Sequence, residues 1–407
     1  MRWENKKLSD CCISIADGDH QPPPKADSGI PFVTIANISA TNQFDFSNTM
    51  FVPQEYYNRL DSKRKAQKDD ILYSVVGSFG IPVYMRETIP FVFQRHIAIL
   101  RPNESILPKF LYYTMLSRDF YMMADAAALG AAQRTISLTA LRNMKIAVPL
   151  MDIQKKIADI LSAYDDLIEN NQKQIKLLEE AAQRLYKEWF VDLRFPGHET
   201  TPIVDGVPEG WTYKPFSEVF DYVRGKSYTS KELSDTTGIL MANLKNIRAF
   251  GGYNRNAEKR FTGQYKANQM LYTGDIVMGV TDMTQERRLV GHVALVPDLG
   301  EKMTFSMDLI KIIPKLTDNL FLYSAMYYGG LSKQISPLAN GVNVLHLKPE
   351  AMMGIEMLIP TKDILERYHQ QFAPMVTRIE ALQKQCDVAA EARDRLIPKL
   401  MNREIEV

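Results

Sequence analysis

The chain has 407 residues, of which 45% are hydrophobic and 24% are charged, and its formal net charge is +1. This length predicts two or three domains with a composition ordinary for a soluble globular protein. No apolar run approaches the length of a membrane span and no export signal opens the chain, so we expect a cytoplasmic protein without a membrane partner. Because the charges nearly cancel, any surface for nucleic acid must be regional.

Residues 1–150 are predicted to form a first globular domain. Short runs rich in β-forming residues begin at Ile30, Asp70 and Phe91, and Gly, Pro, Asn or Asp bound each of them. A helix is expected from Lys109, over KFLYYTMLSRDFYMMADAA, followed by the loop GAAQRTIS and the apolar run MKIAVP. These elements predict an α+β domain.

Residues 151–195 are predicted to form a long spacer helix. The stretch from Asp152 to Val191 contains neither Gly nor Pro and is dense in helix-forming residues. Mostly apolar residues recur in it at alternating steps of four and three, the seam of a heptad repeat, and such a seam needs a partner helix. The seam residues are Ile157, Leu161, Tyr164, Ile168, Asn171, Ile175, Leu178, Ala182, Leu185 and Trp189. At about 1.5 Å per residue the seam is roughly 50 Å long.

Residues 196–360 are predicted to form a second globular domain, which begins after the Pro- and Gly-rich linker RFPGHETTPIVDGVPEG. Its motifs repeat those of the first domain in the same order: GILMANLKNI matches GIPFVTIANI, and MTFSMDLIKIIP matches FVFQRHIAILRP. From Gly130 and Gly341 onward the two copies align without a gap, at an offset of 211 residues. The chain is therefore a tandem duplication.

Residues 361–407 repeat the long helix. The second seam reads Tyr368, Phe372, Met375, Ile379, Leu382, Cys386, Ala389, Arg393, Leu396 and Leu400. Only Arg393 is not apolar, and Pro374 is expected to bend the helix early, so that its regular part follows Met375. If the long helix leaves each domain in the same direction, the two helices pair as an antiparallel coiled coil. The arrangement is then pseudo-two-fold, with a globular domain at each end. The alternative is that each helix packs on its own domain.

Motifs for catalysis are missing from the sequence. It has no Walker-type phosphate loop, no GxGxxG after a strand, no HExxH and no NPPY or DPPY motif. Cys11, Cys12 and Cys386 offer neither a disulfide framework nor the spacing of zinc ligands. The GSFG turn from Gly77 to Gly80 is interpreted as a tight turn rather than a phosphate cradle. We therefore expect a chain that is not an enzyme and holds no metal or cofactor.

Basic residues gather in two stretches, one in each domain. They are Arg59, Lys63, Arg64, Lys65 and Lys68, and then Lys245, Arg248, Arg255, Lys259, Arg260 and Lys266. We take the two stretches to correspond in the duplication. Lys and Arg of this kind neutralise DNA phosphates without reading sequence, and the alternative is a solvated charged loop.

Base readout requires fork-shaped or amide side chains on loops, because Arg pairs with guanine and Asn or Gln with adenine. The candidates are Asp17, Asp19, His20 and Gln21; Gln133 and Arg134; Thr284, Gln285, Arg287 and Arg288; and Asn340 and Asn343.

Two segments carry a resemblance to a known family. They are LYKEWFVDLRFPGHE, which closes the first helix, and DGDH followed by GIPFVTIANIS near the start of the chain. With the twofold order of domain and helix, the whole chain resembles the DNA specificity (S) subunit of type I restriction-modification systems. The resemblance implies that the domains are target recognition domains, which read a bipartite, asymmetric target with a fixed gap in double-stranded DNA.

The resemblance also implies partners. They are two adenine methyltransferase subunits, which use S-adenosylmethionine, and a translocating restriction endonuclease subunit for cleavage. Two other interpretations of the sequence stay open. The chain could be a coiled-coil scaffold whose heads bind proteins, or a small-molecule enzyme with duplicated domains.

Overall fold

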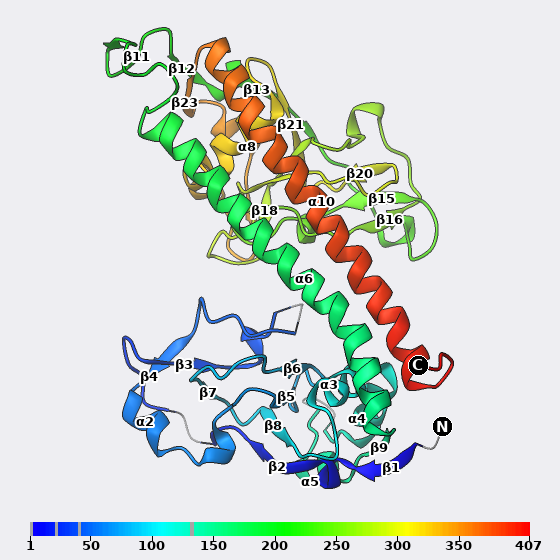
Figure 1. Cartoon of the computed structure of the whole chain (residues 1–407). Helices are drawn as coiled ribbons and strands as arrows, with labels where there is room; N and C mark the ends of the chain where they lie inside the picture. The colour runs from blue at the N-terminus through cyan, green and yellow to red at the C-terminus, as the bar shows by residue number, and fades with distance from the viewer. Residues whose placement is uncertain (1–2, 21–22, 40–41, 131–133) are drawn as a thin grey trace. The chain divides into compact units, whose positions relative to one another are not determined.

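The structure, a computed structural model, describes residues 3–20, 23–39, 42–130 and 134–407 (Figure 1). The chain divides into two compact units. Unit 1 consists of residues 1–170 and 385–407, and unit 2 consists of residues 171–384, so both long helices contribute to both units. Each unit combines sheets and helices, which confirms the predicted α+β class.

Unit 1 is built around an antiparallel four-stranded sheet in the order β2-β8-β5-β6. A second sheet has the order β4-β3-β7, in which β3 pairs antiparallel with β4 and parallel with β7, and β1 pairs with β9. The strands are β1 (Glu4–Lys7), β2 (Cys12–Asp17), β3 (Ile30–Val33), β4 (Met50–Val52), β5 (Ile71–Ser74), β6 (Pro82–Tyr84), β7 (Val92–Phe93), β8 (Ile97–Pro102) and β9 (Lys145–Val148). The β-rich runs predicted from Ile30, Asp70 and Phe91 are thus strands of this unit.

The helices of unit 1 include one correction to the sequence prediction. They are α1 (Leu8–Cys11), α2 (Gln54–Arg59), α3 (Pro108–Leu116), α4 (Arg118–Ala127) and α5 (Leu138–Asn143), with 3₁₀ turns η1 (Ile35–Asn37) and η2 (Ser62–Arg64). The single helix expected from Lys109 is two helices, because Ser117 is extended and caps α4. Its Oγ accepts a hydrogen bond from the backbone N–H of Phe120 at 3.2 Å.

Unit 2 repeats this plan. Its main sheet has the order β13-β21-β17-β19, its second sheet the order β14-β16-β15-β20, and two further pairs are β12-β23 and β18-β22. The strands are β12 (Thr212–Pro215), β13 (Phe220–Arg224), β14 (Leu233–Ser234), β15 (Ile239–Ala242), β16 (Lys259–Phe261), β17 (Ile276–Gly279), β18 (Thr281–Asp282), β19 (Val293–Leu295), β20 (Met303–Phe305), β21 (Leu309–Pro314), β22 (Leu345–His346) and β23 (Glu356–Ile359), and the linker holds the hairpin β10 (Ile203–Val204) and β11 (Val207–Pro208). The helices and turns are α7 (Phe216–Val219), α8 (Asn319–Tyr327), α9 (Leu331–Ile335), η4 (Ser230–Glu232), η5 (Leu244–Asn246), η6 (Ala267–Gln269), η7 (Ser336–Leu338) and η8 (Pro349–Met352).

The strand pairing confirms the duplication. The central pair joins Ile71 to Leu100 in unit 1 and Ile276 to Ile312 in unit 2. The parallel pair β3-β7 recurs as the parallel pair β15-β20. The same short runs of β-branched and aromatic residues therefore form the same sheets twice.

The two long helices are α6 (Met151–Tyr186), which continues into a π-helical turn (η3, Lys187–Val191), and α10 (Lys362–Met401). The expectation that the regular part of the second helix follows Met375 is wrong, because α10 is helical from Lys362 onward. Pro374 is exposed and removes only one backbone donor, while the neighbouring Phe372 is buried and holds the helix on the core. No helix in the described ranges combines the length and apolarity needed to span a bilayer.

The helices pack antiparallel in each unit. In unit 1, Leu161 of α6 lies in one hydrophobic cluster with Ile397 of α10. In unit 2, the rings of Tyr186 and Tyr368 lie 6.4 Å apart, and Arg378 donates to Gln174 Oε1 at 3.2 Å. In unit 1 the N-terminal part of α6 packs on the C-terminal part of α10, and in unit 2 the C-terminal part of α6 packs on the N-terminal part of α10. This confirms the antiparallel coiled coil. The same clusters include residues of the globular parts, so in each unit both helices also pack on the globular part.

The seam residues are buried or half-buried along both helices. The buried members are Ile157, Leu161, Ile168, Asn171, Ala182, Trp189, Tyr368, Phe372, Leu382, Ala389 and Leu400. The half-buried members are Tyr164, Ile175, Leu178, Leu185, Met375, Ile379, Cys386, Arg393 and Leu396. Near the end of α10 the buried face also takes in Ile397, which lies next to the predicted seam.

Candidate nucleic-acid interface

Two loops of unit 2, residues 283–289 and 340–344, meet directly after the main sheet. The strands β18 and β22 pair beneath them, and Asn340 and His346 exchange backbone hydrogen bonds of 3.0 and 2.9 Å. Gln285 Nε2 donates a hydrogen bond of 2.8 Å to the carbonyl oxygen of Val342. The two candidate loops of the second domain therefore form one surface, called here the unit 2 loop pair.

Asp282 anchors this loop pair from below. Its side chain is almost fully buried and accepts hydrogen bonds from the backbone N–H of Thr284 at 2.8 Å, Leu289 at 2.6 Å and Val290 at 3.3 Å. Burial raises the pKa of Asp282, but these donors lower it by more, so the pKa lies below its ordinary value. An ionised carboxylate thus holds both ends of the 283–289 loop.

The unit 2 loop pair presents polar side chains to solvent. Gln285, Arg288 and Asn343 are exposed, and Arg288 forms an ion pair with the neighbouring Glu286. Arg287 is half-buried and has a positive φ of 52°. Arg, Gln and Asn are the side chains that pair with guanine and adenine edges, so the surface has the chemistry of base readout.

Unit 1 has a loop pair in the same topological place, formed by residues 77–80 and by the described residues 129, 130, 134 and 135. Leu129 and Thr135 exchange backbone hydrogen bonds of 2.9 and 2.8 Å, and the N–H of Gly77 donates to the carbonyl oxygen of Arg134 at 3.0 Å. Gly77 has a positive φ of 71°, as the predicted tight turn requires. This arrangement, the unit 1 loop pair, repeats the arrangement in unit 2.

Arg134 is the candidate base reader of the unit 1 loop pair. Its guanidinium forms an ion pair with Asp125 and lies 5.6 Å from the centre of the Phe79 ring. These two contacts fix the side chain while leaving it 42% exposed. Gln133, and also Gln21, lie outside the described residues.

Asp19 and His20, the other candidates of unit 1, follow the end of β2. Asp19 accepts a hydrogen bond from the Tyr56 hydroxyl. His20 Nε2 lies 2.7 Å from a carboxylate oxygen of Asp17. The exposed His20 ring remains accessible to solvent.

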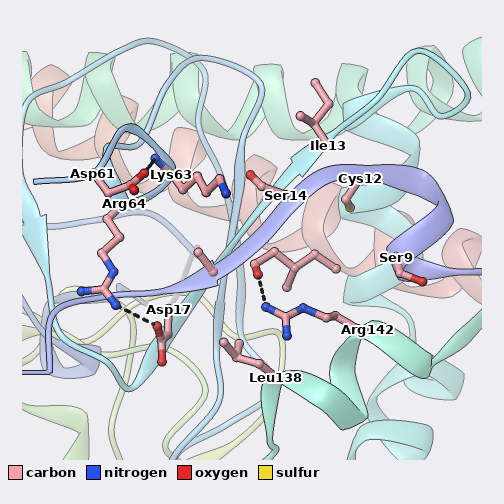
Figure 2. Close-up of a pocket in the computed structure, with 12 residues that line it drawn as sticks. Ser9, Cys12, Ile13, Ser14, Asp17, Asp61, Lys63, Arg64, Leu138 and Arg142 are labelled. Atoms are coloured by element: carbon pink, nitrogen blue, oxygen red, sulfur yellow. Dashed lines mark hydrogen bonds and ion pairs between the residues drawn. The ribbon is translucent and has the colours of Figure 1, made fainter.

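A groove of about 550 Å³ runs along β2, the edge strand of the main sheet of unit 1 (Figure 2). Three basic side chains from two separate segments line it: Lys63 and Arg64 of η2, and Arg142 of α5. Arg64 lies 3.6 Å from Asp17, and Arg142 donates to the carbonyl oxygen of Ile15 at 2.6 Å. Asp17 and Asp61 also line the groove, so its three cations outnumber its carboxylates by one, and this positive balance suits phosphate binding.

Arg142 was not a sequence candidate. It lies in the run LTALRNMKIAVP, outside both basic stretches, and nothing in that run indicates which residues surround it in the fold. Only the fold places it beside Lys63 and Arg64, which are far away in the chain.

The basic stretches do not correspond in the duplication, which corrects the sequence interpretation. In unit 1 the stretch covers η2, just before the central strand β5, and the matching turn of unit 2 is η6. Lys259 and Arg260 instead lie on β16, the counterpart of β4. The two stretches are alike in composition, but the segments that contain them differ in length. The strand pairing shows that the stretches lie at different places in the two units.

The remaining basic candidates differ in what surrounds them. Lys65 Nζ lies 5.1 Å from the Tyr57 ring centre, and Lys259 Nζ lies 5.2 Å from that of Tyr228. Arg260 forms two hydrogen bonds of 2.9 Å with Glu301, so its charge is already paired. The exposed candidates are Lys68, Lys245 and Arg248.

In the described part of the chain, no group of three or more His, Cys, Asp or Glu side chains is arranged to hold a metal ion.

Comparison with known proteins gives consistent results. Residues 2–180 match the family described as type I restriction modification DNA specificity domain. The chain is 26% identical over 431 residues to the type I restriction enzyme MjaIX specificity subunit of Methanocaldococcus jannaschii, covering 100% of this chain and 94% of the relative. It is 22% identical over 450 residues to the type I restriction enzyme HindI specificity subunit of Haemophilus influenzae, covering 92% of this chain and 95% of the relative.

A solved structure shares the fold. The crystal structure of a type I restriction-modification system S subunit from M. genitalium gives a TM-score of 0.59 at 13% identity, covering 98% of this chain and 96% of that chain. Residues 2–180 thus match the model of this family, and over its whole length the chain is similar to type I restriction enzyme specificity subunits and shares the fold of this solved S subunit.

Proposed function

We propose that the chain is the sequence-specific DNA-binding subunit of a type I restriction-modification complex and that each unit reads one half of a bipartite, asymmetric target. One observation carries the proposal. Two copies of one fold place a loop pair at the same topological position, with different side chains on each. A common scaffold with diverged loops suits the recognition of two different sequences.

Base contacts are assigned to the two loop pairs. Arg134 and Arg288 have the planar fork that pairs with guanine, and Gln285 and Asn343 have the amide that pairs with adenine. The hydrogen bonds that Asp282 accepts and that Gln285 donates hold the unit 2 loops before DNA binds, which reduces the entropy lost on binding. Asp19, His20, Gln133 and Arg287 complete the set of proposed base contacts.

Phosphate contacts are assigned to the basic side chains that surround the loops. Lys63, Arg64 and Arg142 share the groove along β2. The other proposed phosphate contacts are Lys65, Lys68, Lys245, Arg248, Lys259 and Arg260. Such contacts contribute affinity for all sequences and make binding depend steeply on salt.

Catalysis is assigned to partner subunits. The sequence has no NPPY or DPPY motif of the adenine-methyltransferase type, and its relatives are named specificity subunits. Two adenine methyltransferase subunits would bind S-adenosylmethionine, and a translocating endonuclease subunit would join for cleavage. Exposed side chains of α6 and η3, among them Lys173 and Lys176 of α6 and Lys187 of η3, are available to such partners.

Reconstitution tests this assignment. The purified chain alone should bind DNA with a steep salt dependence and transfer no methyl group from S-adenosylmethionine. Methylation of defined adenines should appear when the partner methyltransferase subunit is added. Methyl transfer by the isolated chain would refute the assignment, and a chain that binds proteins but retains no DNA would favour the scaffold interpretation.

A further inference from the structure

A cavity of about 520 Å³ lies within unit 2, lined by α8 and by the parts of α6 and α10 that belong to this unit. Its apolar wall consists of the rings of Tyr323, Tyr327 and Tyr328 with aliphatic side chains that include Leu295 and Val376. Pockets for small molecules in proteins have volumes of about 300–1,000 Å³ and similar walls. The cavity therefore has the size and lining of a ligand site.

Two opposite charges line this cavity without pairing with each other. Glu179 on α6 is half-buried, and Arg248 extends from the segment after η5. Among the described residues, neither side chain has a hydrogen-bond or ion-pair partner. Another carboxylate in the lining, that of Glu380, is by contrast held by Arg255 at 2.7 Å and by the backbone N–H of Asp298 at 3.2 Å.

The carboxyl group of Glu179 is partly desolvated. Burial raises its pKa, and the nearby Arg248 lowers it by less, so the pKa of this carboxyl lies above its ordinary value. A partly desolvated carboxyl gains free energy from a donor placed against it. The tyrosine hydroxyls and rings around it favour a cationic donor.

The cavity wall is built closely around the tyrosine rings. The rings of Tyr323 and Tyr327 are stacked, with centres 5.4 Å apart and planes at 29°. Gly251, at a positive φ of 113°, lies so near that an added Cβ would be 2.7 Å from the Tyr327 ring. Glycine thus lets the loop that carries Arg248 close over the aromatic wall.

We propose that this cavity binds a small zwitterion of the amino-acid type, with its ammonium group on Glu179, its carboxylate on Arg248 and an apolar or aromatic side chain among the tyrosines. A ligand with only a positive charge would face the unpaired Arg248. A ligand with only a negative charge would face the unpaired Glu179. A zwitterion satisfies both groups, and its apolar body fits the remaining wall. Arg248 is also one of the proposed phosphate contacts, so the ligand is tested on the chain without DNA.

Calorimetric titration of the full-length chain tests the proposal with three matched probes. L-Tryptophan carries both charges, tryptamine lacks the carboxylate, and indole-3-propionate lacks the ammonium group. We expect saturable binding of L-tryptophan, and binding of each of the other two weaker by about tenfold or more, since each loses one charged hydrogen bond. If L-tryptophan, L-phenylalanine and L-methionine all fail to give saturable binding, the proposal is overturned.

Three variants assign the charges. In Glu179→Gln, L-tryptophan should bind no better than indole-3-propionate, and in Arg248→Gln it should bind no better than tryptamine. Glu180→Gln is the matched control, because Glu180 lies next in the helix, pairs with Arg184 at 3.7 Å and does not line the cavity. Wild-type affinity in both test variants would overturn the proposal. Thermal unfolding of each variant checks the fold, and either test variant suffices if the other does not fold.

Discussion

The guanidinium of Arg393 on α10 lies 2.6 Å from the carboxylate of Asp165 on α6. The hydroxyl of Tyr113 donates to the other oxygen of this carboxylate, also at 2.6 Å. The sequence shows Arg393 only as a break in an apolar seam, but the structure gives it a partner on the facing helix. The side chains of Arg393 and Asp165 are 17% and 12% exposed, so sliding the helices past each other would leave the carboxylate of Asp165 buried without its guanidinium, while Arg393 would keep only its pair with the neighbouring Asp394.

Replacing Arg393 with alanine should destabilise the chain. It leaves the carboxylate of Asp165 largely buried without its guanidinium, and breaking a buried pair in this way costs about 3–5 kcal/mol. Urea unfolding should show this loss as a lower transition midpoint.

Arg395→Ala is the matched control. Arg395 stands on the same helix and pairs with Glu391, but its side chain is 77% exposed, so the free energy of unfolding should change by about 0.5 kcal/mol or less. Equal losses for Arg393→Ala and Arg395→Ala would contradict a special role for the pair with Asp165.

Asp282→Ala should loosen the unit 2 loop pair. The change removes the acceptor for the N–H groups of Leu289 and Val290, with an expected loss of about 1–3 kcal/mol. Amide hydrogen exchange at these two residues should accelerate, and discrimination should fall at one half-site only. Asp235→Ala, at an exposed residue of the same unit, should leave both readouts unchanged.

The pH dependence of this anchor follows from the lowered pKa of Asp282. A carboxyl with a lowered pKa in the folded state contributes stability above its unfolded pKa of about 3.9, and this stability is lost as the pH falls through the folded value. Protection of Leu289 and Val290 should therefore be constant from about pH 5 to 7 and decline below about pH 4. Loss of protection between pH 7 and 5 would show that another group holds the loop.

Arg and Lys substitutions should separate base contacts from phosphate contacts. Arg134→Ala or Arg288→Ala should relax discrimination at one base pair by about 1–3 kcal/mol, because each removes a bidentate guanine contact. Lys65→Ala and Lys259→Ala should weaken binding to all sequences alike and reduce the salt slope. Competition binding against single-base variants of the target measures both effects, and a uniform loss from all four changes would remove the base-contact assignment.

The sequence predicts the regular parts of this fold well. The gapless offset from Gly130 and Gly341 and the heptad spacing from Ile157 predict the duplicated α+β units and the antiparallel helices, because periodicity in the chain directly reflects burial. A single capping serine is a weaker signal of a helix boundary than periodicity is of a helix, so the sequence does not predict the break between α3 and α4 at Ser117.

Side-chain pairing across the fold could not be predicted. Arg393 and Asp165 are 228 residues apart, and only the fold shows that they meet. The same holds for Arg142 beside Lys63, and for the link from Gln285 to Val342 that joins two loops into one surface. Such contacts leave no periodic pattern in the sequence.

The length of the paired helices should set the gap between the half-sites. Removing Glu169–Ile175 from α6 and Glu380–Cys386 from α10 deletes one heptad from each and keeps both seams in phase. The pair becomes about 10 Å shorter at 1.5 Å per residue, which corresponds to about three base pairs of DNA at 3.4 Å each. Asp387 takes the place of Glu380 opposite Arg255, so a carboxylate remains there.

Mapping of methylated sites in cells that carry this shortened subunit measures the gap. We expect both half-sites to keep their sequences while the gap shrinks. The accompanying rotation about the DNA, roughly a third of a turn, is expected to lower affinity as well. An active variant with an unchanged gap would show that the helices do not set the spacing.

Independent reading of DNA by the two units can be tested by a single exchange of residues. Residues 1–149, which end just before α6 begins at Met151, are replaced by the matching segment of a family member with a different target. The methylated sites are then mapped across the genome in cells that carry the hybrid and the methyltransferase subunit. The account predicts that one half-site changes to that of the donor while the other half-site and the gap are preserved. A change in both half-sites, or in neither, would contradict it.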